Sequence, residues 1–193
     1  MVEIRLHGRG GQGTVLAAEI LADAVAKVGK YVQAFPEYGV ERRGAPVKAF
    51  IRIDDDIIYI KSQIYEPDHL VILEPALIGA VDLTYGLKEG GWIIINTNKD
   101  PPDMEFEGNY RIATVPATKI ALKNRLGSKA SPIVNTAILG GVIRILGLCD
   151  LDTLVEAVRE GVPIKENANE AATREAYELI KGGKWCLRNP IKR

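Results

Sequence analysis

The sequence predicts an α/β fold: a layered, mostly parallel sheet with an inserted antiparallel hairpin and a helical C-terminal third. Residues 2–36 follow the order strand, glycine-rich turn, helix and strand, which is typical of a βαβ unit. Residues 69–73 and 92–95 are uniformly apolar, as expected of strands that are covered on both faces. From residue 131 onward, apolar residues recur at a helical period.

In the first 36 residues the spacing of apolar side chains changes from that of a strand to that of a helix. Residues 2–6 alternate apolar and charged side chains, which predicts a strand. Residues 14–28 place their apolar side chains on one face of a helix, and Gly29 is a natural stop. Residues 31–35 predict a second strand, which Pro36 closes.

The next segment predicts an antiparallel hairpin. Residues 37–46 are polar and glycine-rich and predict a loop. Residues 47–53 alternate as a strand does, three aspartates at 54–56 indicate a solvated turn, and residues 57–61 resume the strand pattern.

The middle of the chain returns to the α/β pattern. The apolar runs 69–73 and 92–95 predict buried strands, joined by a short helix near residues 77–87 that a glycine pair ends. Residues 110–115 predict a further strand.

The last third predicts helices. Ser131 and Pro132 indicate a helix start, since serine caps helix N-termini and proline suits the first helical position. The predicted helices span residues 133–146, 151–160 and 165–181. Gly140 and Gly141 lie inside the first of them, and each costs roughly 1 kcal/mol of helix stability. We therefore expect another helix or another chain to pack closely there.

Length and composition limit the function. A chain of 193 residues suits one domain, which we expect over residues 1–183 with a tail at 184–193. The net charge of +0 argues against a general nucleic-acid or membrane-surface binder. Two cysteines without a Cys-x-x-Cys motif cannot hold an iron–sulfur cluster of the usual kind, and no zinc motif is present. The sequence starts with a strand and has no membrane-length apolar run, so we expect a cytoplasmic protein.

The turn after the first strand carries the strongest local motif. Gly8, Gly10 and Gly13 match G-x-G-x-x-G between a strand and a helix, where backbone N–H groups and the helix dipole attract an anion. Arg9 adds a positive charge. The motif suggests a Rossmann-like dinucleotide site, but no acidic residue ends the second strand before its proline. A tight turn that binds nothing is the other interpretation.

A longer series of motifs carries a resemblance. The segments in chain order are His-Gly-Arg-Gly-Gly-Gln-Gly at 7–13, Gln-Ala-Phe-Pro-Glu-Tyr-Gly at 33–39, Glu-Arg-Arg-Gly-Ala-Pro-Val at 41–47, Ile-Tyr-Glu-Pro-Asp at 64–68 and Leu-Glu-Pro at 73–75. Together they resemble the gamma subunits of 2-oxoacid:ferredoxin oxidoreductases of the pyruvate type, the pyruvate synthases. The resemblance extends over essentially the whole chain.

The resemblance implies a place in a multi-subunit enzyme. Such enzymes decarboxylate a 2-oxoacid with thiamine diphosphate, pass electrons through iron–sulfur clusters to ferredoxin and transfer the acyl group to coenzyme A. It further implies alpha, beta and delta partner subunits, which hold thiamine diphosphate, Mg and the clusters. Pyruvate is the expected substrate, with a branched-chain 2-oxoacid as the alternative. This chain alone is then expected to be inactive and to supply no catalytic residue and no metal ligand.

The resemblance and the anion-binding motif suggest two roles, subunit assembly and coenzyme A binding. The candidate binding residues are Gly8, Arg9, Gly10, Gly11, Gln12, Gly13, Arg42 and Arg43. The two neighbouring arginines also fit a subunit contact. His7 is interpreted as a structural histidine with satisfied hydrogen bonds. A stand-alone NAD-dependent Rossmann dehydrogenase remains the competing hypothesis.

Overall fold

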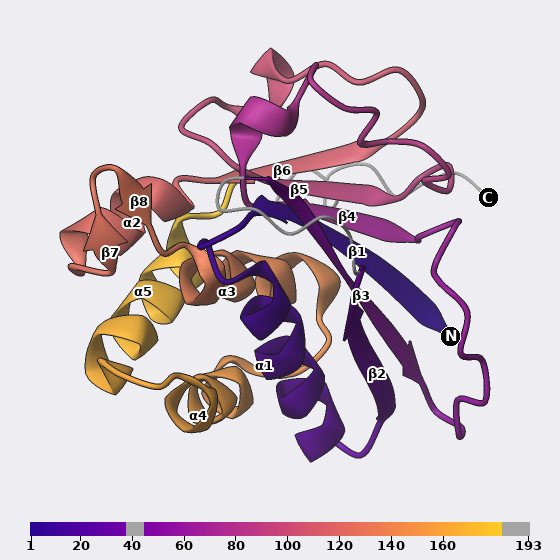
Figure 1. The fold of residues 1–193 in the computed structure, drawn as a ribbon, viewed down its shortest axis with the longest axis horizontal. Helices are drawn as coiled ribbons and strands as arrows, with labels where there is room; N and C mark the ends of the chain where they lie inside the picture. The colour runs from indigo at the N-terminus through magenta and orange to yellow at the C-terminus, as the bar shows by residue number, and fades with distance from the viewer. Residues whose placement is uncertain (38–44, 183–193) are drawn as a thin grey trace.

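A six-stranded sheet with the strand order β2-β3-β1-β4-β5-β6 forms the centre of the fold (Figure 1). This computed structural model describes residues 1–37 and 45–182. The strands of this sheet are β1 (Val2–Arg9), β2 (Tyr31–Pro36), β3 (Pro46–Asp54), β4 (His69–Ile72), β5 (Trp92–Asn96) and β6 (Arg111–Val115). A separate small pair consists of β7 (Gly127–Ser128) and β8 (Ser131–Pro132). The helices are α1 (Thr14–Lys27), α2 (Ala117–Lys123), α3 (Asn135–Leu146), α4 (Leu151–Gly161) and α5 (Glu166–Leu179).

The antiparallel strand β3 lies between β1 and β2. It pairs antiparallel with both of them, while β1, β4, β5 and β6 are mutually parallel. The mostly parallel α/β fold is therefore confirmed, but the predicted hairpin partners are wrong. The hairpin consists of β2 and β3, and residues 57–61 form no strand. Since β3 already has a neighbour on each side, it offers no free edge to residues 57–61.

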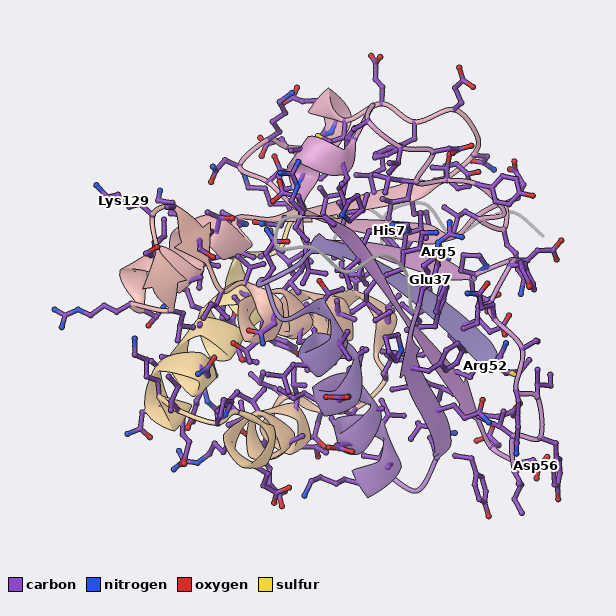
Figure 2. The ribbon with its side chains drawn as sticks, viewed as in Figure 1. Arg5, His7, Glu37, Arg52, Asp56 and Lys129 are labelled. Carbon is purple, nitrogen blue, oxygen red and sulfur yellow. The ribbon has the colours of Figure 1, made fainter. Side chains whose placement is uncertain are left out.

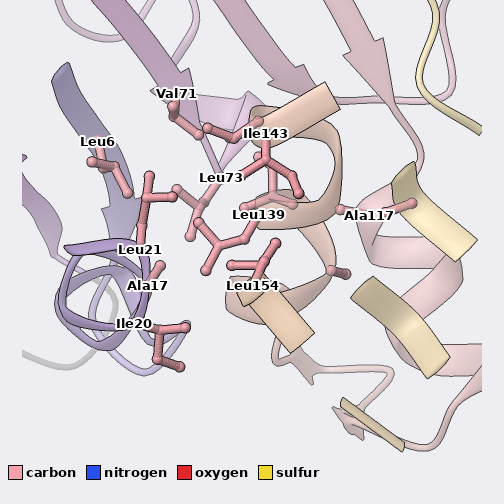
Figure 3. Close-up of a cluster of buried hydrophobic side chains, with 14 of the residues drawn as sticks. Leu6, Ala17, Ile20, Leu21, Val71, Leu73, Ala117, Leu139, Ile143 and Leu154 are labelled. Carbon is pink, nitrogen blue, oxygen red and sulfur yellow. The ribbon is translucent and has the colours of Figure 1, made fainter. Parts of the chain in front are cut away.

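One face of the sheet is covered by helices (Figure 1). Alternate residues of the central strands point to this face, and Figure 3 shows how Leu6, Val71 and Leu73 meet Leu21 of α1 and Leu139 of α3. All five side chains are fully buried. This apolar layer fixes the N-termini of α1 and α3 relative to the strand ends.

The opposite face of β4 and β5 is covered by irregular chain. Leu77, Leu83 and Leu87 pack there on the apolar strand residues. The predicted helix at 77–87 is wrong, because only the 3-10 turn η1 (Pro75–Leu77) forms. The carbonyls of Leu83 and Tyr85 accept hydrogen bonds from the buried Arg5 guanidinium at 2.9 and 2.7 Å, so the segment is held by a side chain in place of a helical ladder.

The C-terminal helices pack as the glycine pair predicted. A Cβ atom on Gly140 would lie 2.0 Å from the carbonyl oxygen of Thr173 in α5, so only glycine permits this approach. The start predicted for α3 is wrong by two residues, since Ser131 and Pro132 form β8. Helix α2 was not predicted. Another short 3-10 turn, η2 (Pro101–Asp103), precedes β6.

Candidate functional site

The glycine loop, residues 8–13, lies at the carboxyl end of β1. At β1 the strand order of the sheet changes direction. From β1 the chain leads to β2 and β3 on one side, and later strands β4 to β6 extend the sheet on the other. Ligands of open α/β sheets bind outside the carboxyl ends of the strands at such a reversal. The topology therefore places residues 8–13 at the preferred ligand position of this architecture.

Two glycines of the loop are required by close contacts. A Cβ on Gly8 would lie 2.1 Å from the Thr14 hydroxyl oxygen. Gly13 has a φ of 78°, and its Cβ would lie 2.6 Å from the side-chain nitrogen of Asn135 at the start of α3. The loop is thus packed tightly between the first turns of α1 and α3.

Part of the loop backbone is already hydrogen bonded. The Arg9 N–H donates to the side-chain oxygen of Gln12 at 2.9 Å, and the Gln12 N–H donates to the Arg9 carbonyl at 3.1 Å. The Gly10 N–H donates to the Ala45 carbonyl at 3.0 Å. These amides cannot also bind a ligand, which confines the predicted anion cradle to Gly11, Gly13 and the first turn of α1.

The N-terminus of α1 has the features of an anion site. Gly13 precedes the helix in a left-handed conformation, no side chain caps the helix, and no acidic residue stands in its first turn. The first N–H groups of a helix lack partners within the helix and carry partial positive charge. The Thr14 hydroxyl is buried beside them, with no hydrogen-bond partner in the part of the chain that the structure describes. A ligand oxygen would satisfy this hydroxyl.

Polar side chains join the strand ends around the loop. The Gln12 amide donates to Glu74 after β4 at 2.7 Å, and Glu74 also accepts from the Ala76 N–H at 3.0 Å. The buried Asn96 side chain donates to the Leu73 carbonyl and to Thr118 Oγ1, each at 2.8 Å. The Glu74 carboxylate repels anions on the β4 side, so the α1 side is favoured for a phosphate.

The sequence analysis missed Glu74, Asn96 and Asn135 at this edge. The signal was present for the first two, since Glu74 and Asn96 each directly follow an apolar run in the sequence. Asn135 is different, because only the packing of α3 against Gly13 brings it to the loop.

Of the three predicted arginines, the structure describes Arg9 alone. Arg9 is half-buried, and it forms no ion pair within residues 1–37 and 45–182. Arg42 and Arg43 lie outside the described residues, as does the predicted tail at 184–193. The structure thus brings Gly8, Arg9, Gln12 and Gly13 together at one strand end.

His7 is buried and neutral. Burial, together with the positive charges of Arg5 and Lys48, lowers its pKa to about 3. Figure 2 shows His7 on β1 near Arg5 and Glu37. The prediction that its hydrogen bonds are satisfied is wrong for Nε2, which has no partner among the described residues. With so low a pKa it is unsuited to proton transfer at neutral pH.

A dinucleotide site would need an acidic residue at the tip of the strand beside β1. Glu37 follows β2, but β3 separates β2 from β1. The Glu37 carboxylate also pairs with Lys48 Nζ at 3.0 Å. Both observations argue against a ribose contact by this carboxylate.

Metal-ligand clusters and membrane-length helices were sought within residues 1–37 and 45–182. No group of three His, Cys, Asp or Glu side chains that could hold a metal ion occurs there. None of the described helices is long and apolar enough to cross a membrane.

Comparison with known proteins shows the family. Residues 3–179 match the family model of pyruvate ferredoxin/flavodoxin oxidoreductase. The chain is 56% identical over 183 residues to the pyruvate/ketoisovalerate oxidoreductases common subunit gamma of Thermococcus kodakarensis, covering 92% of this chain and 96% of that protein. It is 49% identical over 182 residues to the pyruvate synthase subunit PorC of Methanothermobacter marburgensis, covering 94% and 98%.

A solved structure agrees. The crystal structure of pyruvate oxidoreductase subunit PORC from Thermotoga maritima has a TM-score of 0.78 and 37% sequence identity, covering 93% of this chain and 97% of that chain. The family model, the relatives and the shared fold lead to the same assignment. The chain belongs to the pyruvate ferredoxin/flavodoxin oxidoreductase family and is a gamma subunit of a 2-oxoacid:ferredoxin oxidoreductase.

Proposed function

We propose that this gamma subunit binds coenzyme A through the glycine loop and the first turn of α1. The complex to which it belongs would oxidatively decarboxylate pyruvate to acetyl-CoA and CO2 and pass the electrons to ferredoxin. Alpha, beta and delta subunits in the cytoplasm would be its partners, and they would hold thiamine diphosphate, Mg and the iron–sulfur clusters. The names of the Thermococcus and Methanothermobacter relatives support this proposal.

The observation that carries the coenzyme A role is the uncapped N-terminus of α1 with the unpartnered Thr14 hydroxyl. Coenzyme A carries a pyrophosphate and a further phosphate, and helix N-termini favour such groups. Arg9, which is half-buried, adds a full positive charge, and its guanidinium can donate bidentate hydrogen bonds to a phosphate. The chain would therefore bind and orient the acyl acceptor, while the chemistry of decarboxylation takes place on the thiamine diphosphate of a partner.

A second 2-oxoacid is favoured by one observation. The Thermococcus relative is named a common subunit of pyruvate and ketoisovalerate oxidoreductases. This chain would likewise serve two complexes if the 2-oxoacid side chain is selected by other subunits. Purified complexes that share the chain and differ in substrate preference would support this extension, and a gamma chain found only in a pyruvate-specific complex would contradict it.

The coenzyme A site is tested by Thr14→Val in the reconstituted complex. Valine has the shape of threonine and lacks the hydroxyl, which makes no hydrogen bond within the described structure, so the melting temperature should not fall. Loss of one ligand hydrogen bond should raise the KM for coenzyme A about fivefold to tenfold. Decarboxylation of pyruvate without coenzyme A should remain unchanged.

The contribution of the Arg9 charge to coenzyme A binding is tested by Arg9→Ala, with Lys129→Ala as the matched control. Both remove one positive charge, but Lys129 is exposed in the turn between β7 and β8, far from the glycine loop (Figure 2). We expect only Arg9→Ala to raise the KM for coenzyme A. An unchanged KM in both Thr14→Val and Arg9→Ala would refute the site, and failure of the chain to co-purify with thiamine-bearing subunits would refute the wider function.

A further inference from the structure

A segment without regular structure, residues 57–63, carries exposed apolar side chains at the sheet end opposite the glycine loop. It follows the turn near Asp56 and runs along the outside of the molecule to β4 (Figures 1 and 2). Ile57, Tyr59 and Ile60 are 54%, 81% and 46% exposed, and none of residues 57–63 is buried. An exposed run of large apolar residues lowers the solubility of a protein, and where such a run is kept it commonly marks an interaction site.

The sheet holds this segment through side chains. Arg52, which is 1% exposed, donates to the carbonyls of Ile60 at 3.4 Å and Gln63 at 3.1 Å. The Gln33 amide donates to the Ile58 carbonyl at 3.1 Å. The Arg52 guanidinium is itself fixed by Glu3 at 2.7 Å. A buried charge is thus used to order a segment that adds no buried side chain of its own.

The hydrogen bonds show which way the segment faces. The carbonyls of Ile58 and Ile60, two residues apart, both turn inward to the sheet. Along an extended chain alternate residues direct their N–H and C=O groups to the same side, so a strand formed here would direct those of Ile57, Tyr59 and Lys61 outward. No backbone N–H of residues 57–63 donates to an acceptor in the described part of the chain. Ile-Ile-Tyr-Ile is also a sequence that favours strands.

We infer that residues 57–61, which form no strand in this structure, become one in the assembled enzyme by pairing, through backbone hydrogen bonds, with an extended segment of a neighbouring subunit of the oxidoreductase. Addition of a strand to a free edge is a recurring mode of protein recognition. The inference rests on the proposed assembly with partner subunits. It assigns to this edge a role in assembly that is separate from the ligand role of the glycine loop.

Charge defines the chemistry of the partner segment. Asp55 pairs with Lys30, whereas the exposed Asp56 has no ion pair in the described structure. A basic side chain of the partner opposite Asp56 would complete the charges at this end, and apolar side chains would cover Ile57 and Tyr59. The expected occupant is therefore an extended, apolar segment with a lysine or arginine near one end.

Hydrogen–deuterium exchange of the 57–63 peptide tests the inference directly. In the isolated chain these amides should exchange at close to unprotected rates, because their N–H groups lack acceptors. In the purified complex, exchange should slow by at least about tenfold. An unchanged rate in a complex that has assembled would overturn the inference and leave the proposed function intact.

A proline scan separates the backbone from the side chain. Tyr59→Pro removes the outward N–H together with the side chain, whereas Tyr59→Ala removes the side chain only. Both should leave the melting temperature of the isolated chain unchanged, since Tyr59 is 81% exposed. The dissociation constant for the remaining subunits should rise about tenfold more for Tyr59→Pro than for Tyr59→Ala.

Two other results would overturn the inference. Equal affinities of the two variants would exclude backbone pairing. Protection of residues 57–63 that appears in the isolated chain as its concentration rises would identify a second copy of this chain as the occupant. A chain that binds no thiamine-bearing subunit at all would overturn the inference and the proposed function together.

Discussion

Replacement of Arg52 by methionine should destabilise the chain by about 3–5 kcal/mol, the usual cost of removing one partner of a buried ion pair. Methionine keeps the apolar stem, but Glu3 loses its partner at 2.7 Å, and the carbonyls of Ile60 and Gln63 lose their donor. For a domain of this size the melting temperature should fall by roughly 10 °C. Urea unfolding and calorimetry of the isolated chain measure both quantities.

The double variant Glu3→Gln/Arg52→Met tests the cause. It removes both charges, so it should be more stable than Arg52→Met alone by about 1–3 kcal/mol. Lys123→Met is the matched control, because Lys123 pairs with Glu175 at 2.8 Å at the surface and should matter by less than about 1 kcal/mol. Additive effects of the two substitutions would refute the reasoning that the Glu3–Arg52 pair acts as a unit.

Three further predictions follow from packing and titration. Gly140→Ala should cost about 1–3 kcal/mol in urea unfolding despite the better helix propensity of alanine, because its Cβ would meet the Thr173 carbonyl at 2.0 Å; an unchanged midpoint would contradict the close α3–α5 contact. The pKa of His7 is about 3 in the folded chain and about 6.5 in the unfolded chain, so between these values only the unfolded chain binds the proton. The free energy of unfolding should therefore fall by about 2 kcal/mol between pH 7.5 and 5, and His7→Gln should remove this pH-dependent loss. Cys149 should resist iodoacetamide at pH 8 in peptide mapping, because burial and the nearby Asp150 raise its pKa to about 11; rapid labelling would contradict this.

Local patterns predicted most single elements of the fold. The strands at β4 and β5, the helix α1 and the close packing at Gly140 were readable, because apolar period and glycine position depend on neighbours in the sequence. The helix predicted at 77–87 failed for a tertiary reason. Arg5 donates hydrogen bonds to the carbonyls of Leu83 and Tyr85. A donor about 80 positions away in the sequence cannot be recognised from a local pattern.

The motif predicted the turn between β1 and α1, which is confirmed, since glycines between a strand and a helix are a local signal. That this turn binds an anion stays a prediction. The motif did not show that the Arg9 and Gly10 amides are occupied within the protein, because these bonds depend on the Gln12 rotamer and on Ala45. The unpartnered Thr14 hydroxyl is likewise a consequence of packing.

The position of β3 explains how a glycine fingerprint can serve a use other than dinucleotide binding. In a dinucleotide-binding fold the acidic residue stands on the strand next to the glycine loop, one strand spacing of about 4.8 Å away. Here β3 occupies that place, so the tip of β2 lies roughly 10 Å from β1. The backbone amides and the helix dipole at α1 remain available to a phosphate, but the ribose contact does not. The same insertion leaves residues 57–61 without a partner in the sheet, so one topological change accounts both for the missing ribose contact and for the unpaired segment that we infer to serve assembly.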